Sequence, residues 1–288
     1  MPAKIQTASR FEESVLTIRK AYAGCPEDRH FLNLMYYLLG WLVSDAGKSF
    51  SDKHPWARLE LDLSRKHPEK LNLGNFVVSC VSLVGVPCGR IRDGPPRNRD
   101  PHGMYRWMSY FSEVFFWFHT ACLGLEKKQL TSYDPVRMDW LLTASPDSIL
   151  WFLRGIADSD ETVNVRNKTV EITSEPNGPP FVKLFAKVGV RATIRKSKGY
   201  NCVSISVSDA AKVRIFNPEL ETHRNRIINK LATAQTFQAR WPRWLEERAR
   251  QLLTKNPDVR AVRNTLQFED NTYVKLMTLK VKISRMMN

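Results

Sequence analysis

Two long apolar runs in the chain are each followed by segments in which apolar and polar residues alternate. Residues 31–45 (FLNLMYYLLGWLVSD) and 144–160 (ASPDSILWFLRGIADSD) are apolar on nearly every side, which predicts two buried helices. Residues 56–63 (WARLELDL) alternate strictly and predict a half-buried strand with a charged outer face. Residues 162–173 alternate in the same way and predict a hairpin.

The remaining pattern completes two similar halves. We expect helices at 1–25, 71–86, 112–124, 178–189 and 209–217, and strands at 104–111, 190–195 and 201–207. The order helix, two strands, helix, two strands, helix thus occurs twice, which indicates an internal repeat. We divide the chain into an N-terminal arm with a first repeat (1–124), a polar linker (125–144), a second repeat (145–218) and a basic, mainly helical extension (219–288).

The two apolar runs also share a local sequence. LLGWLVSDA (38–46) and LRGIADSDE (153–161) both place a glycine five residues before an aspartate. Over residues 20–217 the chain resembles the LAGLIDADG homing endonucleases, in their single-chain, two-repeat form. The resemblance implies an α+β fold of two pseudo-symmetric αββαββα repeats with antiparallel DNA-binding sheets, to which the helical C-terminal extension is added.

Physical chemistry explains why a glycine and an aspartate would occupy these positions in each run. A glycine inside an apolar helix costs about 1 kcal/mol relative to alanine, so we expect Gly40 and Gly155 to mark a close approach of two helix backbones. Each helix then ends in an acid, Asp45 or Asp160, at the negative end of its dipole. Side-by-side packing would bring these acids together, and a divalent cation would relieve their repulsion. We expect Asp158, which the first repeat does not match, to be solvated or to cap the helix.

The resemblance implies a site-specific double-strand DNA endonuclease that hydrolyses phosphodiesters with Mg²⁺ or Mn²⁺. Asp45 and Asp160 take the catalytic positions, and they share the metal site with Ala46 and Glu161, which stand where the family usually has glycine. The family often has a lysine near a strand end at the catalytic centre. The comparable stretch here has serines, and its substitutes would be Lys48, Arg106 or Arg195.

The outer faces of the predicted strands suit the major groove of DNA, because arginine and asparagine can read purine edges and acids accept from cytosine. The expected DNA-contacting residues are Lys48, Arg58, Glu60, Asp62, Arg90, Arg92 and Arg106 in the first repeat, and Asn164, Arg166, Arg191, Arg195, Asn201, Ser204 and Ser206 in the second.

Composition supports a nucleic-acid partner. The 44 Lys and Arg against 29 Asp and Glu give a net charge of +15 and a pI near 9.7. The five cysteines form no CxxC pair, which favours a reducing compartment. No apolar run reaches the roughly 20 residues of a membrane span. We therefore expect an intracellular monomer, in the cytoplasm or an organelle matrix, that binds double-stranded DNA and no membrane.

Two readings compete with the nuclease. One is a relative that binds nucleic acid without cleaving it, either an intron RNA maturase with RNA as a ligand or a WhiA-like DNA-binding regulator. Glu161, the missing lysine and the basic tail favour it. The other, an intein fragment, lacks splicing-domain signatures. Within the tail, a turn at 268–271 would place Tyr273, Lys275 and Lys280 on the recognition helix of a helix-turn-helix. The apolar face of residues 241–253 instead favours a brace for the second repeat.

Overall fold

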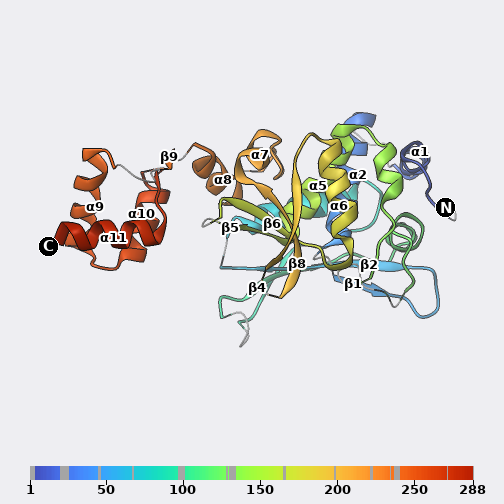
Figure 1. Ribbon diagram of the computed structural model, residues 1–288. Coiled ribbons are helices and arrows are strands. Elements are labelled where there is room, and N and C mark those ends of the chain that lie inside the picture. The colour runs from blue at the N-terminus through green and yellow to red at the C-terminus, as the bar shows by residue number, and fades with distance from the viewer. Residues whose placement is uncertain are drawn as a thin grey trace.

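The computed structural model contains two repeated α/β units followed by a separate group of helices (Figure 1). It describes residues 4–19, 26–44, 47–66, 68–96, 101–127, 129, 134–164, 167–197, 199–220, 223–233, 235–236, 241–270 and 272–287. The two units have the same order of helices and strands, each with one antiparallel four-stranded sheet. The α+β fold class and the repeat expected from the sequence are therefore confirmed.

The first repeat follows a short N-terminal helix, α1 (Ala8–Ile18), whose Thr7 side chain caps its start. Its strands pair antiparallel in the order β1-β2-β4-β3. The repeat order implied the short strands β1 and β3, but their bounds could not be predicted from the sequence, because neither is long enough to show an alternating pattern. The elements are α2 (Asp28–Val43), β1 (Gly47–Phe50), β2 (Ala57–Ser64), α3 (Lys70–Ser82), β3 (Arg92–Gly94), β4 (Met104–Met108) and α4 (Glu113–Trp117), which continues as the π-helical turn Phe118–Cys122.

The second repeat begins at Pro146, where the Ser145 hydroxyl accepts a hydrogen bond from the Ser148 backbone N–H at 3.2 Å. This is a serine cap followed by proline in the first helical position. The strands pair in the order β5-β6-β8-β7, which repeats the order of the first sheet. The elements are α5 (Pro146–Asp160), β5 (Glu161–Asn164), β6 (Thr169–Thr173), α6 (Gly178–Lys187), β7 (Ala192–Ser197), β8 (Tyr200–Ser206) and α7 (Val207–Lys212).

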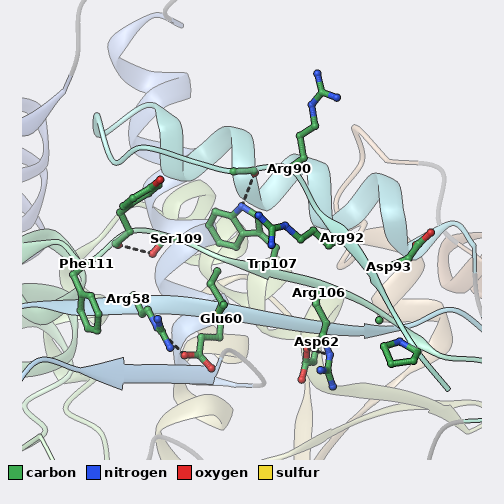
Figure 2. Close-up of a pocket in the computed structure, with 15 residues that line it drawn as sticks. Arg58, Glu60, Asp62, Arg90, Arg92, Asp93, Arg106, Trp107, Ser109 and Phe111 are labelled. Atoms are coloured by element: carbon green, nitrogen blue, oxygen red, sulfur yellow. Dashed lines mark hydrogen bonds and ion pairs between the residues drawn. The ribbon is translucent and has the colours of Figure 1, made fainter. Parts of the chain in front are cut away.

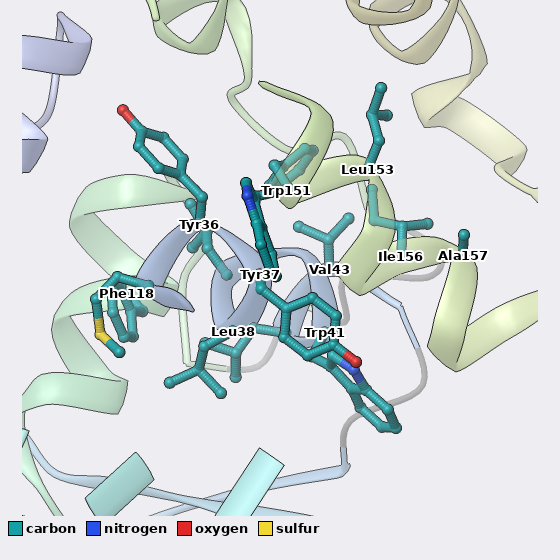
Figure 3. Packing of buried hydrophobic residues seen from close by; sticks show 14 of the residues in the cluster. Tyr36, Tyr37, Leu38, Trp41, Val43, Phe118, Trp151, Leu153, Ile156 and Ala157 are labelled. Carbon is teal, nitrogen blue, oxygen red and sulfur yellow. The ribbon is translucent and has the colours of Figure 1, made fainter. Parts of the chain in front are cut away.

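Helices α2 and α5 pack against each other at the centre of the molecule. Figure 3 shows side chains of both helices in this core, among them Tyr37 and Trp41 of α2 and Ile156 of α5, and all three are at most 1% exposed. Both helices are covered on nearly all sides, as their apolar runs predict. None of the helices in the described part of the chain is long and apolar enough to cross a membrane.

The segment between the repeats is partly built into this core. Its second half forms a 3₁₀ helix, Asp139–Thr143, in which Trp140 and Leu141 are buried. The Trp140 indole N–H donates to the Cys122 carbonyl at 2.9 Å, which ties the segment to the first repeat. The polar composition of 125–144 thus concealed a packed second half.

The C-terminal helices form a small core of their own. Helix α8 (His223–Thr233) still packs on α7, but Trp241, Leu245, Val262 and Leu279 belong to a second buried cluster, separate from the main one. The elements are β9 (Gln235–Thr236), α9 (Arg243–Lys255), α10 (Val259–Phe268), β10 (Thr272–Tyr273), which pairs parallel with β9, and α11 (Leu276–Met287). We call residues 241–287 the C-terminal unit.

Candidate nucleic-acid interface and metal-binding acids

The two motif glycines meet where α2 and α5 cross. A Cβ built on Gly40 would lie 2.1 Å from the Phe152 carbonyl oxygen, and one on Gly155 would lie 2.0 Å from the Tyr37 carbonyl oxygen. Each hypothetical Cβ is also 3.1 Å from the Cα of the other glycine. Only residues without a side chain fit at this crossing, because real Cβ atoms do not approach backbone oxygen this closely.

The C-terminal ends of the two helices are also in contact. The hydroxyl of Ser44, the residue after α2, bonds directly to the hydroxyl of Ser159, the penultimate residue of α5. The Ser159 hydroxyl also donates to the Gly155 carbonyl at 3.0 Å, so the serine contact lies one turn beyond the glycine crossing. The negative ends of both helix dipoles therefore meet at one point between the two sheets.

The expected metal-binding acids follow these serines in the sequence. Asp160 is the last residue of α5 and Glu161 the first of β5, whereas Asp45 and Ala46 lie outside the described residues. Among the residues whose side chains are described, no group of three His, Cys, Asp or Glu could hold a metal ion. The contact between Ser44 and Ser159 brings together the two residues that directly precede Asp45 and Asp160 in the sequence. Hard oxygen donors beside two negative helix ends fit a divalent cation such as Mg²⁺.

The prediction that Asp158 is solvated or a cap was wrong, because the residue is 2% exposed. Its Oδ2 accepts hydrogen bonds from the Tyr37 hydroxyl at 2.8 Å and from the Asn217 backbone N–H at 3.2 Å. Burial raises the pKa of Asp158 to about 7, although both hydrogen bonds and the nearby Arg224 lower it. Asp158 therefore faces away from the helix ends and links the two repeats through Tyr37.

Replacing Tyr37 by phenylalanine should lower the free energy of unfolding by about 1–3 kcal/mol, because the buried Asp158 carboxyl loses one of its donors. Chemical denaturation would measure the change. Tyr36→Phe is the matched control, since the Tyr36 hydroxyl donates to Glu12, a half-buried group that water can reach. Equal losses in the two variants would show that the Tyr37–Asp158 bond has no special role.

Lys48 does not lie on the expected DNA face. In β1 it pairs with Leu59 of β2, so its side chain is on the side of the sheet that the helices cover. Burial lowers the pKa of Lys48 to about 7. Burial also lowers the pKa of His119, to which the nearby positive charge of Lys48 makes a smaller contribution. The residue is therefore removed from the expected DNA contacts, while its place four residues after Ser44 keeps it near the end of α2.

The outer face of the first sheet carries the charged residues that the alternation predicts. The register places Arg58, Glu60 and Asp62 of β2 on one face with Arg106 of β4 and Arg92 of β3. Two acids are neutralised there, since Arg58 pairs with Glu60 at 2.9 Å and Arg106 with Asp62 at 3.3 Å. Arg92 lies directly opposite Arg106 across the strand pair, a like-charge arrangement that a bound anion would stabilise.

These residues line an open groove of about 720 Å³ (Figure 2). Arg90 and Arg92 line it, with Arg92 beside Trp107 and Arg90 pointing away from the strands, and neither has an acidic partner among the described residues. One wall of the groove is apolar and exposed, with Met108, Tyr110 and Phe111 between 41% and 64% accessible. We did not single out this wall from the sequence, although Met108 and Tyr110 continue the alternation of Arg106.

The second sheet has a less charged outer face. Its register places Asn164, Arg195, Ser204 and Ser206 on one side, with Arg195 exposed. Ser204 is only 3% exposed, because its short side chain lies on a central strand between the register partners Glu171 and Thr193.

Asn201 does not lie on this face. Asn201 pairs with Lys196 on the opposite, helix-covered side, because it is one residue out of step with Arg195 and its partner Cys202. Ser204, being buried, and Asn201 are therefore removed from the expected DNA contacts. Arg191 is exposed just before β7, and Arg166 lies outside the described residues.

No model of a protein family matches the chain, and no curated protein matches its sequence. Solved structures do match it. They are LAGLIDADG proteins. The crystal structure of I-DmoI in complex with DNA and Mn matches with a TM-score of 0.44 and 14% identity, over 63% of this chain and 94% of that one. The family that the motifs resemble is thus also the family of these structures.

Two further matches have similar extent. The N-terminal LAGLIDADG domain of DUF199/WhiA matches with a TM-score of 0.41 and 14% identity, over 75% of this chain and 96% of that one. The homing endonuclease I-WcaI bound to its DNA recognition sequence matches with a TM-score of 0.46 and 11% identity, over 72% and 90%. Likeness at this level does not define an activity, and the fold described above rests on the strand order and register of this chain.

Proposed function

We propose that the chain is a site-specific double-strand DNA endonuclease of the LAGLIDADG type that uses a divalent metal. The observation that carries the proposal is the contact between Ser44 and Ser159, because it joins two helix ends that are each followed by a carboxylate residue. Two carboxylates beside two negative helix ends are unfavourable without a cation. A cation there would lie between two sheets whose outer faces can bind DNA.

In this mechanism the chain positions one acid for each DNA strand. Asp45 and Asp160 would hold the metal, with Ala46 and Glu161 completing the site. The bound cation would supply Lewis-acid stabilisation of the negative charge that develops on the phosphodiester. Gly40 and Gly155 set the separation of the acids, because their backbone contact fixes the distance between the helix axes. The hydroxyl bond between Ser44 and Ser159 holds the same helix ends in register.

The outer faces of the sheets would bind the duplex. Arg90 and Arg92 are free of acidic partners among the described residues and suit phosphates or guanine edges. The pairs Arg58–Glu60 and Arg106–Asp62 present donors and acceptors together, which suits base reading more than phosphate binding. The face of the second sheet offers the neutral groups of Asn164 and Ser206, the cation of Arg195, and Glu171, whose carboxylate accepts a hydrogen bond from Asn164.

The test is selection of a binding site from a library of random duplexes in EDTA, followed by a cleavage assay on that site. We expect cutting of both strands when Mg²⁺ or Mn²⁺ is added, and no cutting in EDTA. Arg92→Ala should weaken binding about tenfold, since a specific base contact is worth about 1–3 kcal/mol. Arg10→Ala, on the exposed surface of α1, should leave the affinity unchanged.

A non-cleaving DNA-binding regulator is the second candidate. It is favoured by the C-terminal unit, which has its own core beyond the two repeats, and by Glu161, an additional negative charge beside the expected metal site. Stoichiometric binding of the selected duplex without nicking in either metal would support this candidate and contradict the nuclease.

A further inference from the structure

The C-terminal unit does not brace the second repeat through its apolar face. Trp241, Leu245 and Ala249 of the α9 region pack with residues of α10 and α11, among them Leu266 and Ile283. This cluster is separate from the core of the repeats. Most of the apolar face that we expected to pack on the second repeat is thus buried inside the unit, while Trp244 stays 45% exposed. The outer surface of the unit is left for another role.

The charges of the unit are unbalanced at that surface. Residues 241–288 hold ten Lys and Arg against five Asp and Glu. All five acids are engaged within the unit: four form ion pairs with Arg243, Arg248 or Lys282, and Asp258 caps α10. Five exposed basic side chains have no acidic partner among the described residues, namely Arg250, Lys255, Arg260, Lys275 and Lys280. A surface of this kind attracts a polyanion.

Helix α11 presents an exposed face that combines lysine with apolar side chains. Leu279 and Ile283 point into the unit, whereas Met277, Lys280, Val281 and Ser284 share the opposite face at helical spacing. Met277 is 70% exposed and Val281 is 48% exposed. A helix with this face fits the major groove of DNA, about 12 Å wide, where apolar groups contact thymine methyls and lysines reach phosphates or guanine.

The unit stands at the outer end of the second sheet. Strand β5 starts directly after α5, so the turn before β6 is the end of this strand pair that lies away from the helix ends. At this turn, the Lys168 ammonium lies 5.0 Å from the centre of the Tyr273 ring, and α11 starts three residues after Tyr273. Figure 1 shows α9, α10 and α11 beyond β5 and α8, at one end of the molecule.

We propose that α11 binds the major groove of double-stranded DNA beside the segment covered by the second sheet. The protein would then contact about one additional helical turn on that side of its site, and the target would be asymmetric in length. This inference rests on the proposed function, because it takes the outer faces of the sheets as the central DNA-binding surface. The other occupant of such a helix face, a second copy of this chain, would require the basic residues around it to pack against a chain that is itself strongly basic.

The test compares two double variants of the full chain. Lys275→Gln/Lys280→Gln changes two exposed lysines, one directly before α11 and one on its exposed face. Lys183→Gln/Lys187→Gln changes two exposed lysines on α6, which packs on the opposite face of the second sheet. Binding to a 40-base-pair random duplex, a length of about four helical turns, would be measured by fluorescence anisotropy over a series of KCl concentrations. We expect the slope of log K against log salt to become shallower by about 1.8 in the α11 variant, roughly 0.9 per lost contact. The α6 variant should keep the wild-type slope.

Further readouts separate the outcomes. Melting temperatures equal to wild type would show that both variants are folded, and hydroxyl-radical footprints on the selected duplex should lose about one helical turn of protection on one side only in the α11 variant. An unchanged slope and footprint in a folded α11 variant would overturn the inference, even if cleavage persists. A shallower slope and a shorter footprint in the α11 variant, without any cleavage by the wild type, would support the α11 inference and contradict only the proposed nuclease activity. A fall in molar mass on Met277→Ser/Val281→Ser, with DNA binding intact, would overturn it in favour of a self-association surface.

Discussion

Asp160→Asn is expected to stop cutting of one strand of the selected duplex, and Asp45→Asn should stop cutting of the other. Both changes remove a negative charge and a metal ligand while keeping the shape of the side chain. Changes that only disturb the orientation of a metal ligand already cost about 10–100-fold in activity, so loss of the ligand should cost at least about 100-fold. A plasmid assay that separates nicked from linear product would show nicked circles for each variant.

DNA affinity should stay within a few-fold in both variants, because the acids lie at the helix ends and the expected DNA contacts lie on the strands. Asp158→Asn is the matched control. It is the same change two residues earlier in α5, but its carboxyl faces Tyr37 and Asn217 instead of the helix ends. We expect this control to cut both strands. Equal loss of binding and cutting in Asp160→Asn would instead assign a structural role to that residue.

Gly155→Ala should destabilise the protein by at least about 3 kcal/mol, which is near the upper end of the usual cost of overpacking. The added Cβ would lie 2.0 Å from the Tyr37 carbonyl oxygen, and neither backbone can move without separating α2 from α5. The same separation would break the contact between Ser44 and Ser159, so cutting should fall together with stability.

Gly89→Ala is the control for this change. A Cβ at Gly89 would meet no atom within 4 Å, so its effect on the free energy of unfolding should stay within about 0.5 kcal/mol. Urea denaturation of both variants gives the comparison. A Gly155→Ala variant as stable as Gly89→Ala would show that the helices can separate at little cost, and the shared placement of the two acids would lose its basis.

The sequence predicted the architecture of the repeats because the patterns involved are local. Apolar runs of helical length identified α2 and α5, and strict alternation identified β2 and the strands of the second sheet. Glycine at the same distance from an acid in both runs pointed to the helix crossing, since a buried glycine in a helix needs a close neighbour. The faces of Arg58, Glu60 and Asp62 were predictable for the same reason, because residues two apart in a strand share a face.

Strand register decided which polar residues reach the outer surface. Lys48 is beside Ser49 in the sequence, but pairing with Leu59 puts it on the covered face. Asn201 lies on the covered face of the second sheet, because it is one residue away from Cys202, the partner of the outward-facing Arg195. The length of the side chain mattered as well, since Ser204 lies on the outer face and is still covered. Neither effect can be predicted from a segment alone, because both depend on the strand next to it.

The sequence by itself determined two helices that each place a glycine five residues before an acid. It also determined strands with alternating apolar and polar residues in both sheets, and an excess of basic over acidic residues. The tertiary structure alone decided the state of Asp158, whose partners Tyr37 and Asn217 are 121 and 59 residues away in the sequence. It also decided that the apolar face of α9 is covered by α10 and α11 and not by the second repeat. Both outcomes depend on contacts between distant segments. Burial in the folded chain sets the free-energy cost of charging a carboxyl, and an apolar helix face is buried against whichever neighbouring segment offers a matching apolar surface.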